Sequence, residues 1–340
     1  MGCEPATPSH LSPLSAAFRR GFRTALLEWF DRNRRPLPWR ANRDPYPVWV
    51  SEIMLQQTRV AAVLERYPHF LQRFPTVFAL ARAQPASVLA SWSGLGYYRR
   101  ARLLHAAARL IVRQRGGRFP QDRAAWQELP GVGCYTAAAI ASICYEEPCA
   151  AVDGNVERVL QRALGANARD AWWRAGELVG RRRPGDFNQA MMELGAMVCT
   201  PRSPECAQCP VRRRCQAFSA GLPLARPKLT PRQQVRLACA LVLDQGKVLL
   251  VPRGNGEKVM PGMWELPPLP SPPVAGEMHE HFTLKHAIMN TEYLVDVVLH
   301  QGSPLPLPAR DGGQWFKPQR LTKLPLTGLA RKALQRVKIL

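Results

Sequence analysis

One stretch of the chain, residues 129–156, places the strongest limits on the fold. It begins with Leu-Pro-Gly-Val-Gly (129–133), continues as an apolar run with helical spacing (135–143) and ends with Val-Asp-Gly-Asn-Val (152–156). Gly131 and Gly133 flank a small apolar residue, so the backbone can approach a phosphate while the amides of the next helix face it. The stretch predicts a helical hairpin that binds a phosphate backbone, although the pentapeptide alone also fits an ordinary turn between helices.

The charge of the chain favours a polyanionic partner. Its 340 residues carry a formal net charge of +22, and residues 1–229 hold 33 basic and 17 acidic side chains, or +16 of that charge. Nucleic acid is the partner that such a charge indicates. The sequence contains no run of eighteen apolar residues and no secretory signal pattern. We therefore expect a cytoplasmic protein without a membrane partner.

The length of the chain favours two domains. Between residues 15 and 218 apolar side chains recur every three or four positions, which predicts a helical domain at 1–217 with about ten or more helices. Prolines are expected at the helix boundaries, where the missing amide costs little. They stand at positions 36, 38, 45, 47, 68, 75, 85, 120 and 130.

After this helical part the pattern changes. Residues 218–233 lack a periodic apolar face and are interpreted as a linker, and residues 234–340 as a smaller α+β domain. Strands are expected at 235–243, 247–252 and 293–299, an extended loop at 267–273, and a closing helix at 326–337.

Four of the nine cysteines are clustered. Cys199, Cys206, Cys209 and Cys215 are separated by six, two and five residues, and four thiolates in so short a loop can bind one metal centre. Zinc sites more often use two close pairs, whereas one close pair with two outliers favours a [4Fe-4S] cluster. Zinc remains the alternative. Four arginines in the same loop (Arg202, Arg212, Arg213 and Arg214) would present positive charge to phosphates.

Two carboxylates are candidates for acid–base chemistry. Glu52 stands alone in an apolar helical stretch (48–58), where burial would raise its pKa and keep it protonated, as a general acid requires. A lone glutamate on a helix is more often simply solvated. Asp153, at the tight turn before Gly154, supplies a second carboxylate, and such pairs in unlike environments break glycosidic bonds.

Several motifs together resemble the MutY-type adenine DNA glycosylases. They are Ser-Glu-Ile-Met-Leu-Gln-Gln-Thr (51–58), Gly-Leu-Gly-Tyr-Tyr-Arg-Arg-Ala (94–101), the hairpin, the segment 152–156 and the cysteine loop. The resemblance covers nearly the whole chain. It implies a mainly α protein of the helix-hairpin-helix glycosylase fold, with a six-helix barrel and a [4Fe-4S] helical domain, followed by a smaller α+β Nudix-like domain.

The resemblance also assigns roles to individual residues. Glu52 would protonate adenine, Asp153 would stabilise the cationic sugar, and Tyr135 and Asn155 would position these acids. The pocket for the flipped adenine would be lined by Trp39, Arg40, Leu55 and Gln189. The opposite base and the DNA stack would be contacted by Gln56, Gln57, Thr58, Leu95 and Tyr97, and the phosphate backbone by the hairpin glycines Gly131 and Gly133.

By resemblance the partner is double-stranded DNA that contains adenine opposite 8-oxoguanine or guanine, and the protein is expected to act as a monomer in base excision repair. Related endonuclease III-like enzymes with lyase activity carry a lysine two residues after the last hairpin glycine. Here that residue is Tyr135. The resemblance therefore implies a monofunctional glycosylase.

The C-terminal part resembles the Nudix-like domain of the family through residues 248–253 and 262–267. It lacks the glutamate-rich helix of a Nudix hydrolase, since only Glu277 lies between Leu266 and Met278, so nucleotide hydrolysis is not expected. In family members a Phe-Ser/Thr-His loop reads 8-oxoguanine. The matching residues here are Leu284, Lys285 and His286. His286 is therefore the residue expected to contact 8-oxoguanine, and Lys285 stands where family members have the hydroxyl group of serine or threonine.

Two other functions are compatible with parts of this pattern. One is an endonuclease III-like glycosylase and lyase for oxidised pyrimidines, which Tyr135 and the second domain disfavour. The other is a non-catalytic DNA-binding protein with an iron–sulfur cluster, which the presence of both Glu52 and Asp153 disfavours.

Overall fold

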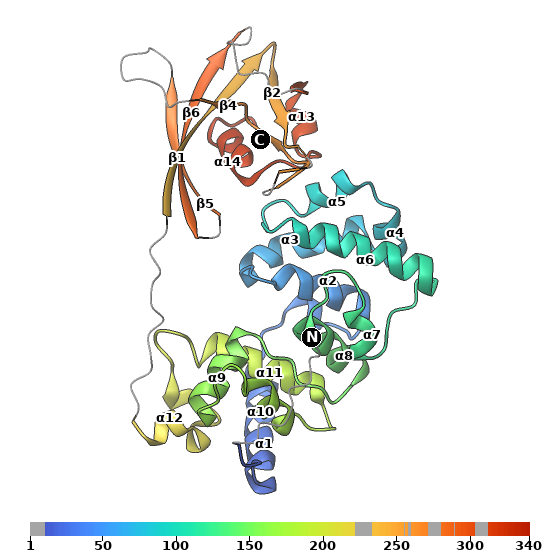
Figure 1. The fold of residues 1–340 in the computed structure, drawn as a ribbon, viewed down its shortest axis with the longest axis vertical. Coiled ribbons are helices and arrows are strands. Elements are labelled where there is room, and N and C mark those ends of the chain that lie inside the picture. Colours follow the sequence, from blue (N-terminus) through green and yellow to red (C-terminus); the bar gives the residue numbers. More distant parts are fainter. Residues whose placement is uncertain are drawn as a thin grey trace. The chain divides into compact units, whose positions relative to one another are not determined.

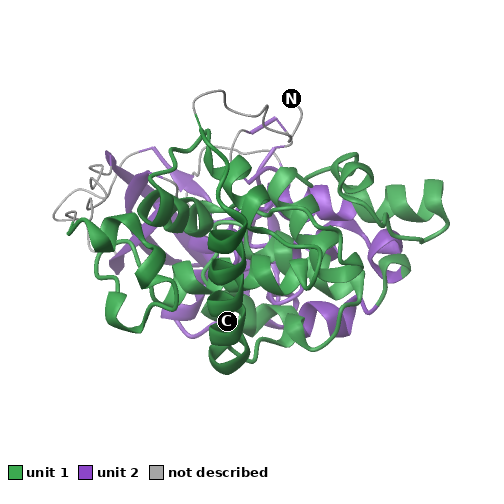
Figure 2. Cartoon of the chain, turned by 90° about the horizontal axis from the view of Figure 1, so that it is seen from below, with its two compact units in different colours: residues 1–67, 76–78, 106–228 green, residues 68–75, 79–105, 229–340 purple. Residues whose placement is uncertain are grey.

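The computed structural model describes residues 11–221, 233–254, 256–257, 260–270, 280–288, 290–302 and 312–340. Two compact units are found (Figures 1 and 2). The first comprises residues 1–67, 76–78 and 106–228, and the second residues 68–75, 79–105 and 229–340. Most of the expected linker, residues 222–232, lies outside the described residues, so the domain boundaries stay a prediction.

Helices dominate residues 11–221, as predicted. They are α1 (Ala16–Asn33), η1 (Pro38–Arg40), α2 (Pro45–Leu55), α3 (Val60–Arg73), α4 (Val77–Arg82), α5 (Pro85–Ser91), α6 (Arg99–Arg115), α7 (Arg123–Gln127), α8 (Cys134–Tyr145), α9 (Gly154–Leu164), α10 (Ala171–Leu178), α11 (Pro184–Met197), η2 (Cys206–Gln208), η3 (Arg212–Arg214) and α12 (Gln216–Ser219). None of the helices in the described part combines the length and apolar character that crossing a bilayer requires.

Two apolar clusters hold the first unit together. One contains Phe22, Leu26 and Phe30 of α1, which pack with buried side chains of α9, α10 and α11. The other is aromatic: the rings of Trp49 and Trp126 lie 6.0 Å apart, and α2 and α7 are thereby fixed to each other. Each large buried side chain contributes about 1.5–3 kcal/mol. This packing holds α2, α8, α9 and α11, the helices that carry the candidate site.

The expectation that every proline lies at a helix boundary is wrong for Pro68. This residue lies inside α3, well past its first turn. A proline there removes one backbone hydrogen bond. The helix nevertheless continues, because its apolar face buries Val63, Tyr67 and Phe70 and so gains more than the lost bond costs.

The C-terminal part of the second unit is built on a sheet with strand order β3-β2-β1-β6-β5. The strands are β1 (Gln233–Asp244), β2 (Lys247–Pro252), β3 (Trp264–Glu265), β4 (Pro268–Leu269), β5 (His281–Ile288), β6 (Thr291–Gln301) and β7 (Gln314–Phe316). β1 pairs in parallel with β6, and β2 and β5 are antiparallel to their neighbours. Two helices follow, α13 (Pro318–Leu321) and α14 (Gly328–Arg336); α14 buries Ala330, Ala333 and Leu334 in the sheet's apolar core.

The three predicted strands and the closing helix are confirmed, with small shifts at their ends. The structure adds β3, β4, β5, β7 and α13. It also corrects the prediction of a reading loop, because Leu284, Lys285 and His286 lie on strand β5. The physical reason is alternation: Phe282, Leu284 and His286 share the inner, half-buried face of β5, while Lys285 is exposed.

Candidate active site

The predicted hairpin joins α7 to α8. Gly131 has φ +79°, a left-handed conformation that favours glycine, and both Gly131 and Gly133 are exposed around the buried Val132. Gly133 is the N-cap residue of α8 and has no side chain with which to cap that helix. A methyl group added to Gly133 would meet only open space. The turn therefore exposes the positive end of α8, a suitable place for a phosphate.

Glu52 lies on α2 and is 6% exposed. Burial raises the pKa of its carboxyl group to about 7; a hydrogen bond with Tyr135 lowers it in part, and the charge of Asp153 raises it further. Within the described part of the chain, its Oε2 atom is buried and has no hydrogen-bond partner. A buried carboxyl group near its midpoint at neutral pH, with one oxygen unused, can transfer a proton to a bound molecule.

Tyr135 and Asp153 complete a group of three with Glu52. Tyr135 stands in the first turn of α8, and its hydroxyl group lies 2.9 Å from Met192 Sδ. Burial raises the pKa of Tyr135 well above the usual value, and the charges of Glu52 and Asp153 add to this shift. The phenol therefore stays protonated and acts as a hydrogen-bond donor. Residues more than 80 positions apart in the sequence thus form one acidic site.

The sequence places Asp153 at the N-cap of α9. Its Oδ1 atom accepts hydrogen bonds from the amides of Asn155 (2.9 Å) and Val156 (2.8 Å), and its Oδ2 atom accepts one from Asn155 Nδ2 (2.9 Å). Helix capping is sufficient to explain an aspartate at this turn, even if Asp153 had no catalytic role. It also fixes the carboxylate rigidly, and its position beside Glu52 gives it a possible second role.

Two of the predicted adenine-binding residues, Arg40 and Gln189, are joined by an ion network around the buried Glu193, which sequence reasoning missed. Arg40 donates to Gln189 Oε1 (3.0 Å) and to Glu193 Oε2 (3.0 Å), and Arg35 donates to the same Glu193 oxygen (2.7 Å). Hydrogen bonds from the two arginines overcome burial and lower the pKa of Glu193 to about 2. Because its oxygen is engaged by Arg40, Gln189 has its amide NH₂ group left to donate to a ligand.

Two further residues of that predicted pocket lie on neighbouring elements. Trp39, in η1, is buried and stacks edge-on against Tyr67, with ring centroids 5.4 Å apart. Leu55 is the last residue of α2. In the turn that follows, Gln57 adopts φ +54°, and Gln56 Nε2 donates to Thr136 Oγ1 at 3.1 Å. The turn 56–58 is thus tied to the start of α8.

Leu95 and Tyr97 belong to the second compact unit. Leu95 is buried, whereas Tyr97 is 43% exposed and has φ +46°. Only Tyr97 of this pair therefore offers an aromatic surface to a partner.

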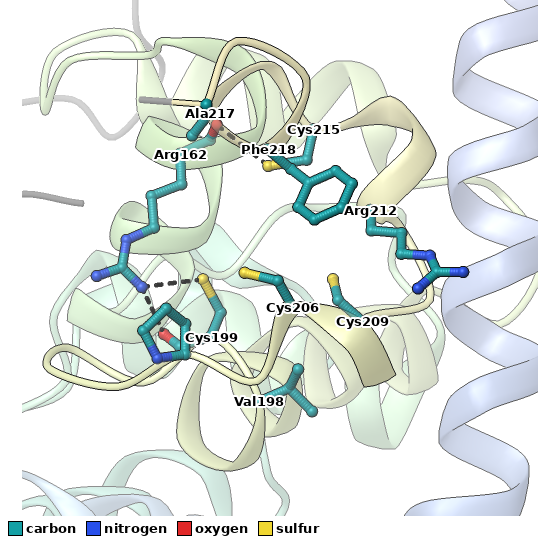
Figure 3. A pocket seen from close by; sticks show the side chains of 11 residues that line it. Arg162, Val198, Cys199, Cys206, Cys209, Arg212, Cys215, Ala217 and Phe218 are labelled. Atoms are coloured by element: carbon teal, nitrogen blue, oxygen red, sulfur yellow. Dashed lines mark hydrogen bonds between the residues drawn. The ribbon is translucent and has the colours of Figure 1, made fainter. Parts of the chain in front are cut away.

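The four clustered cysteines line one cavity of about 310 Å³, together with Arg162 and Arg212 (Figure 3). In the part of the chain that the structure describes, no three His, Cys, Asp or Glu side chains lie close enough to hold a single metal ion. Four thiolates are a donor set that suits either zinc or an iron–sulfur cluster, so the chemistry of the residues that line this cavity is compatible with the predicted cluster.

A chain of hydrogen bonds joins Asp153 to the cysteine loop. Asn155 donates to Asp153 and accepts from Arg158 Nη2 (3.0 Å), and Arg158 Nε donates to the carbonyl of Cys199 (2.8 Å). Arg162 donates to Cys199 Sγ at 3.3 Å. Sequence reasoning missed both arginines; their signal was the spacing of four residues on α9, which places them on one face of that helix.

His286 is half-buried on β5 and lies against Gly328, where an added methyl group would be 3.0 Å from its ring. Burial lowers the pKa of His286, and the charge of Lys332 lowers it further. The ring is therefore neutral at pH 7, and its role in reading a base stays a prediction.

Residues 50–172 match the model of the HhH-GPD superfamily base excision DNA repair protein. The chain is 43% identical over 205 residues to an adenine DNA glycosylase of Mycolicibacterium smegmatis, a match that covers 58% of this chain and 70% of that protein.

It is 37% identical over 327 residues to an adenine DNA glycosylase of Mus musculus, covering 77% of this chain and 63% of the mouse protein, so the match leaves more than a third of that relative unmatched. Among solved structures, a thermostable thymine-DNA glycosylase superposes with a TM-score of 0.57 at 31% identity, over 60% of this chain and 98% of that one.

Proposed function

The chain belongs to the family of adenine DNA glycosylases, and from this membership we propose that it removes adenine paired with 8-oxoguanine or guanine by hydrolysing the N-glycosidic bond. One observation carries the proposal: the buried carboxyl group of Glu52, with a pKa near 7 and one unused oxygen, beside the carboxylate of Asp153. The adenine must leave the base stack to reach it, which costs a few kcal/mol and less at a mispair.

Glu52 acts as the general acid in this proposal. Its proton passes to ring nitrogen 7 of the flipped adenine, which turns the base into a neutral leaving group as the bond to the sugar breaks. Tyr135 donates a hydrogen bond to Glu52 and so holds the carboxyl group in one orientation. After departure of the base, the Glu52 carboxylate accepts a proton from the attacking water.

Asp153 supports the same step from the sugar side. The breaking bond leaves positive charge on the anomeric carbon, and a fixed carboxylate stabilises that charge. Three hydrogen bonds from Asn155 and Val156 hold Asp153 in place before the substrate arrives. Gln189 and Arg40 are proposed to contact the edge of the base.

The proposed enzyme is monofunctional. A lyase needs an amine that attacks the sugar, and the position that carries this lysine in lyase relatives is Tyr135, whose hydroxyl group is already directed at Glu52 and Met192. The DNA backbone would remain intact after adenine is lost.

The partner is duplex DNA, bound by a single copy of the chain. The net charge of +22 and the hairpin glycines support contacts with phosphates, and the exposed ring of Tyr97 supports stacking on the base pair next to the mispair. His286 is proposed to contact the opposite base.

We also propose a [4Fe-4S] cluster bound by Cys199, Cys206, Cys209 and Cys215. The shared cavity of these four residues supports it. When bound, such a cluster supplies a one-electron redox group and closes the loop between its ligands. Arg162 donates a hydrogen bond to Cys199 Sγ, which would disperse the negative charge of that thiolate.

The test uses duplexes with adenine opposite 8-oxoguanine or guanine, and a thymine glycol duplex as control. We expect adenine release from the first two, with strand cleavage only after hot alkali, and no product covalently trapped by borohydride. Strand cleavage without alkali, or trapping, would support the endonuclease III-like alternative. Duplex binding without release of any base would support a non-catalytic DNA-binding protein.

A further inference from the structure

The turn that carries Tyr97 has an unusual backbone. Three of its residues have positive φ: Gly94 (+97°), Gly96 (+69°) and Tyr97 (+46°). Glycine adopts this region freely, but a residue with a side chain is strained there. The same Tyr97 ring is 43% exposed. The structure thus maintains an aromatic ring in solvent at a cost in backbone energy.

The side chain of Arg100, at the start of α6, holds this turn. It is only 8% exposed, and its Nη2 atom donates to the carbonyls of Leu95 and Gly96, both at 3.1 Å. Its guanidinium carbon lies 5.4 Å from the centre of the Trp92 ring and 5.5 Å from that of Tyr97. The indole nitrogen of Trp92 donates to the same Gly96 carbonyl at 3.2 Å.

These contacts act on the two peptide groups that precede Tyr97 and on one face of its ring. A guanidinium group can make all of them at once because it is planar, carries several donors in one plane and stacks on aromatic rings. The ammonium group of lysine has no such plane. The contacts therefore depend on the shape of Arg100 as well as on its charge.

We propose that Arg100 is a positioning residue that preforms Tyr97 as the stacking wedge, an inference that rests on the proposed function. By fixing the turn before DNA arrives, Arg100 removes the entropy cost of ordering the ring during base flipping. It does not touch the adenine; it acts through Tyr97.

The proposal is tested with a double-mutant cycle on adenine release from an 8-oxoguanine:adenine duplex in a single turnover. The variants are Arg100→Lys, Tyr97→Ala and the two combined, with Arg99→Lys as a matched control, since Arg99 is the exposed neighbour at the start of the same helix. Loss of one base–aromatic stack is worth about 1–3 kcal/mol, so we expect Arg100→Lys to slow release roughly 5- to 150-fold. Arg99→Lys should leave the rate unchanged.

In the Tyr97→Ala background, Arg100→Lys should slow release by less than about twofold, because the wedge is already gone. A second duplex carries an abasic site opposite the adenine, so the base stack at that site is already disrupted. On this duplex Arg100→Lys should release adenine at the rate of the parent protein. If Arg100→Lys unfolds the protein, Arg100→Gln, which keeps a planar amide donor, takes its place in the same cycle.

Two outcomes would overturn this inference and leave the proposed function standing. One is a double variant whose rate loss equals the product of the losses of Arg100→Lys and Tyr97→Ala. The other is an equal rate loss for Arg100→Lys on both duplexes. Each would mean that Arg100 supports the fold and not the wedge. A parent protein that releases adenine from neither duplex would instead overturn the proposed function, and the inference with it.

Discussion

Replacing Glu52 by glutamine should inactivate the protein and also stabilise it, and the gain should depend on pH. The pKa of Glu52 rises from 4.5 to about 7 on folding. Above pH 7 the folded state must hold a buried negative charge that the unfolded state leaves in water. This rise in the pKa of Glu52 corresponds to about 3 kcal/mol of lost stability at high pH.

The sign follows from proton binding. Between pH 4.5 and 7 the folded state binds more protons at Glu52 than the unfolded state, so this group lowers stability as the pH rises through that window. Glu52→Gln removes the ionisation and keeps the shape. We expect the variant to gain about 3 kcal/mol in free energy of unfolding at pH 8 and roughly 1 kcal/mol at pH 5.5.

The assay is urea denaturation of the parent protein, Glu52→Gln and Glu28→Gln at both pH values, together with adenine release. Glu28 is an exposed residue of α1 and should give no pH-dependent gain. Release should fall by orders of magnitude in Glu52→Gln while duplex binding survives, and in the parent it should decline above about pH 7. An equal stability change at both pH values, or retained turnover, would refute the assignment of Glu52 as a buried general acid.

Four further predictions follow from individual contacts. Asp153→Asn keeps an oxygen that can cap α9, so the protein should fold normally but lose more than about tenfold in rate; a smaller loss would count against a catalytic carboxylate. Purified protein should be brown, with broad absorbance near roughly 400 nm, and Cys209→Ser should bleach it; a colourless protein with zinc would contradict the cluster. Affinity for any duplex should fall steeply with added salt, and a flat titration would argue against phosphate contacts. His286→Ala should reduce the preference for 8-oxoguanine over guanine by about 1–3 kcal/mol; an unchanged preference would assign His286 to packing against Gly328.

Local sequence patterns predicted the fold correctly where the structure of a segment depends mainly on its own residues. Gly131 and Gly133 predicted the hairpin turn, and the β-rich run 247–252 predicted β2 with the observed bounds. The prediction of secondary structure failed where contacts with distant segments determine the local structure. Residues 284–286 were expected in a loop because the family resemblance placed them there, whereas pairing with β6 along the whole length of β5 makes them part of a strand. Pro68 likewise lies within a helix because of burial that the local sequence does not reveal.

The candidate site was predictable in its parts but not in its assembly. Glu52 and Asp153 could be named from their surroundings in the sequence. The neighbours that set their chemistry could not: Met192 meets the Tyr135 hydroxyl across 57 positions, and Glu193 meets Arg35 across 158. No periodicity links residues so far apart.

A comparison of Glu52 with Glu193 shows how neighbouring residues set the pKa of a buried carboxyl group. Both carboxyl groups are almost fully buried in the same unit, yet the pKa of one is raised to about 7 and that of the other is lowered to about 2. The pKa of Glu52 is raised mainly by burial, whereas the two guanidinium groups that bind Glu193 overcome burial and lower the pKa of that carboxyl group. A fold selected for stability alone would pair both acids in this way. Arg40 reaches Glu193 but only weakly influences Glu52, whose second oxygen is left without a donor among the described residues. The cost of burying Glu52 without an ion-pair partner is therefore the physical basis for expecting a proton transfer at this position.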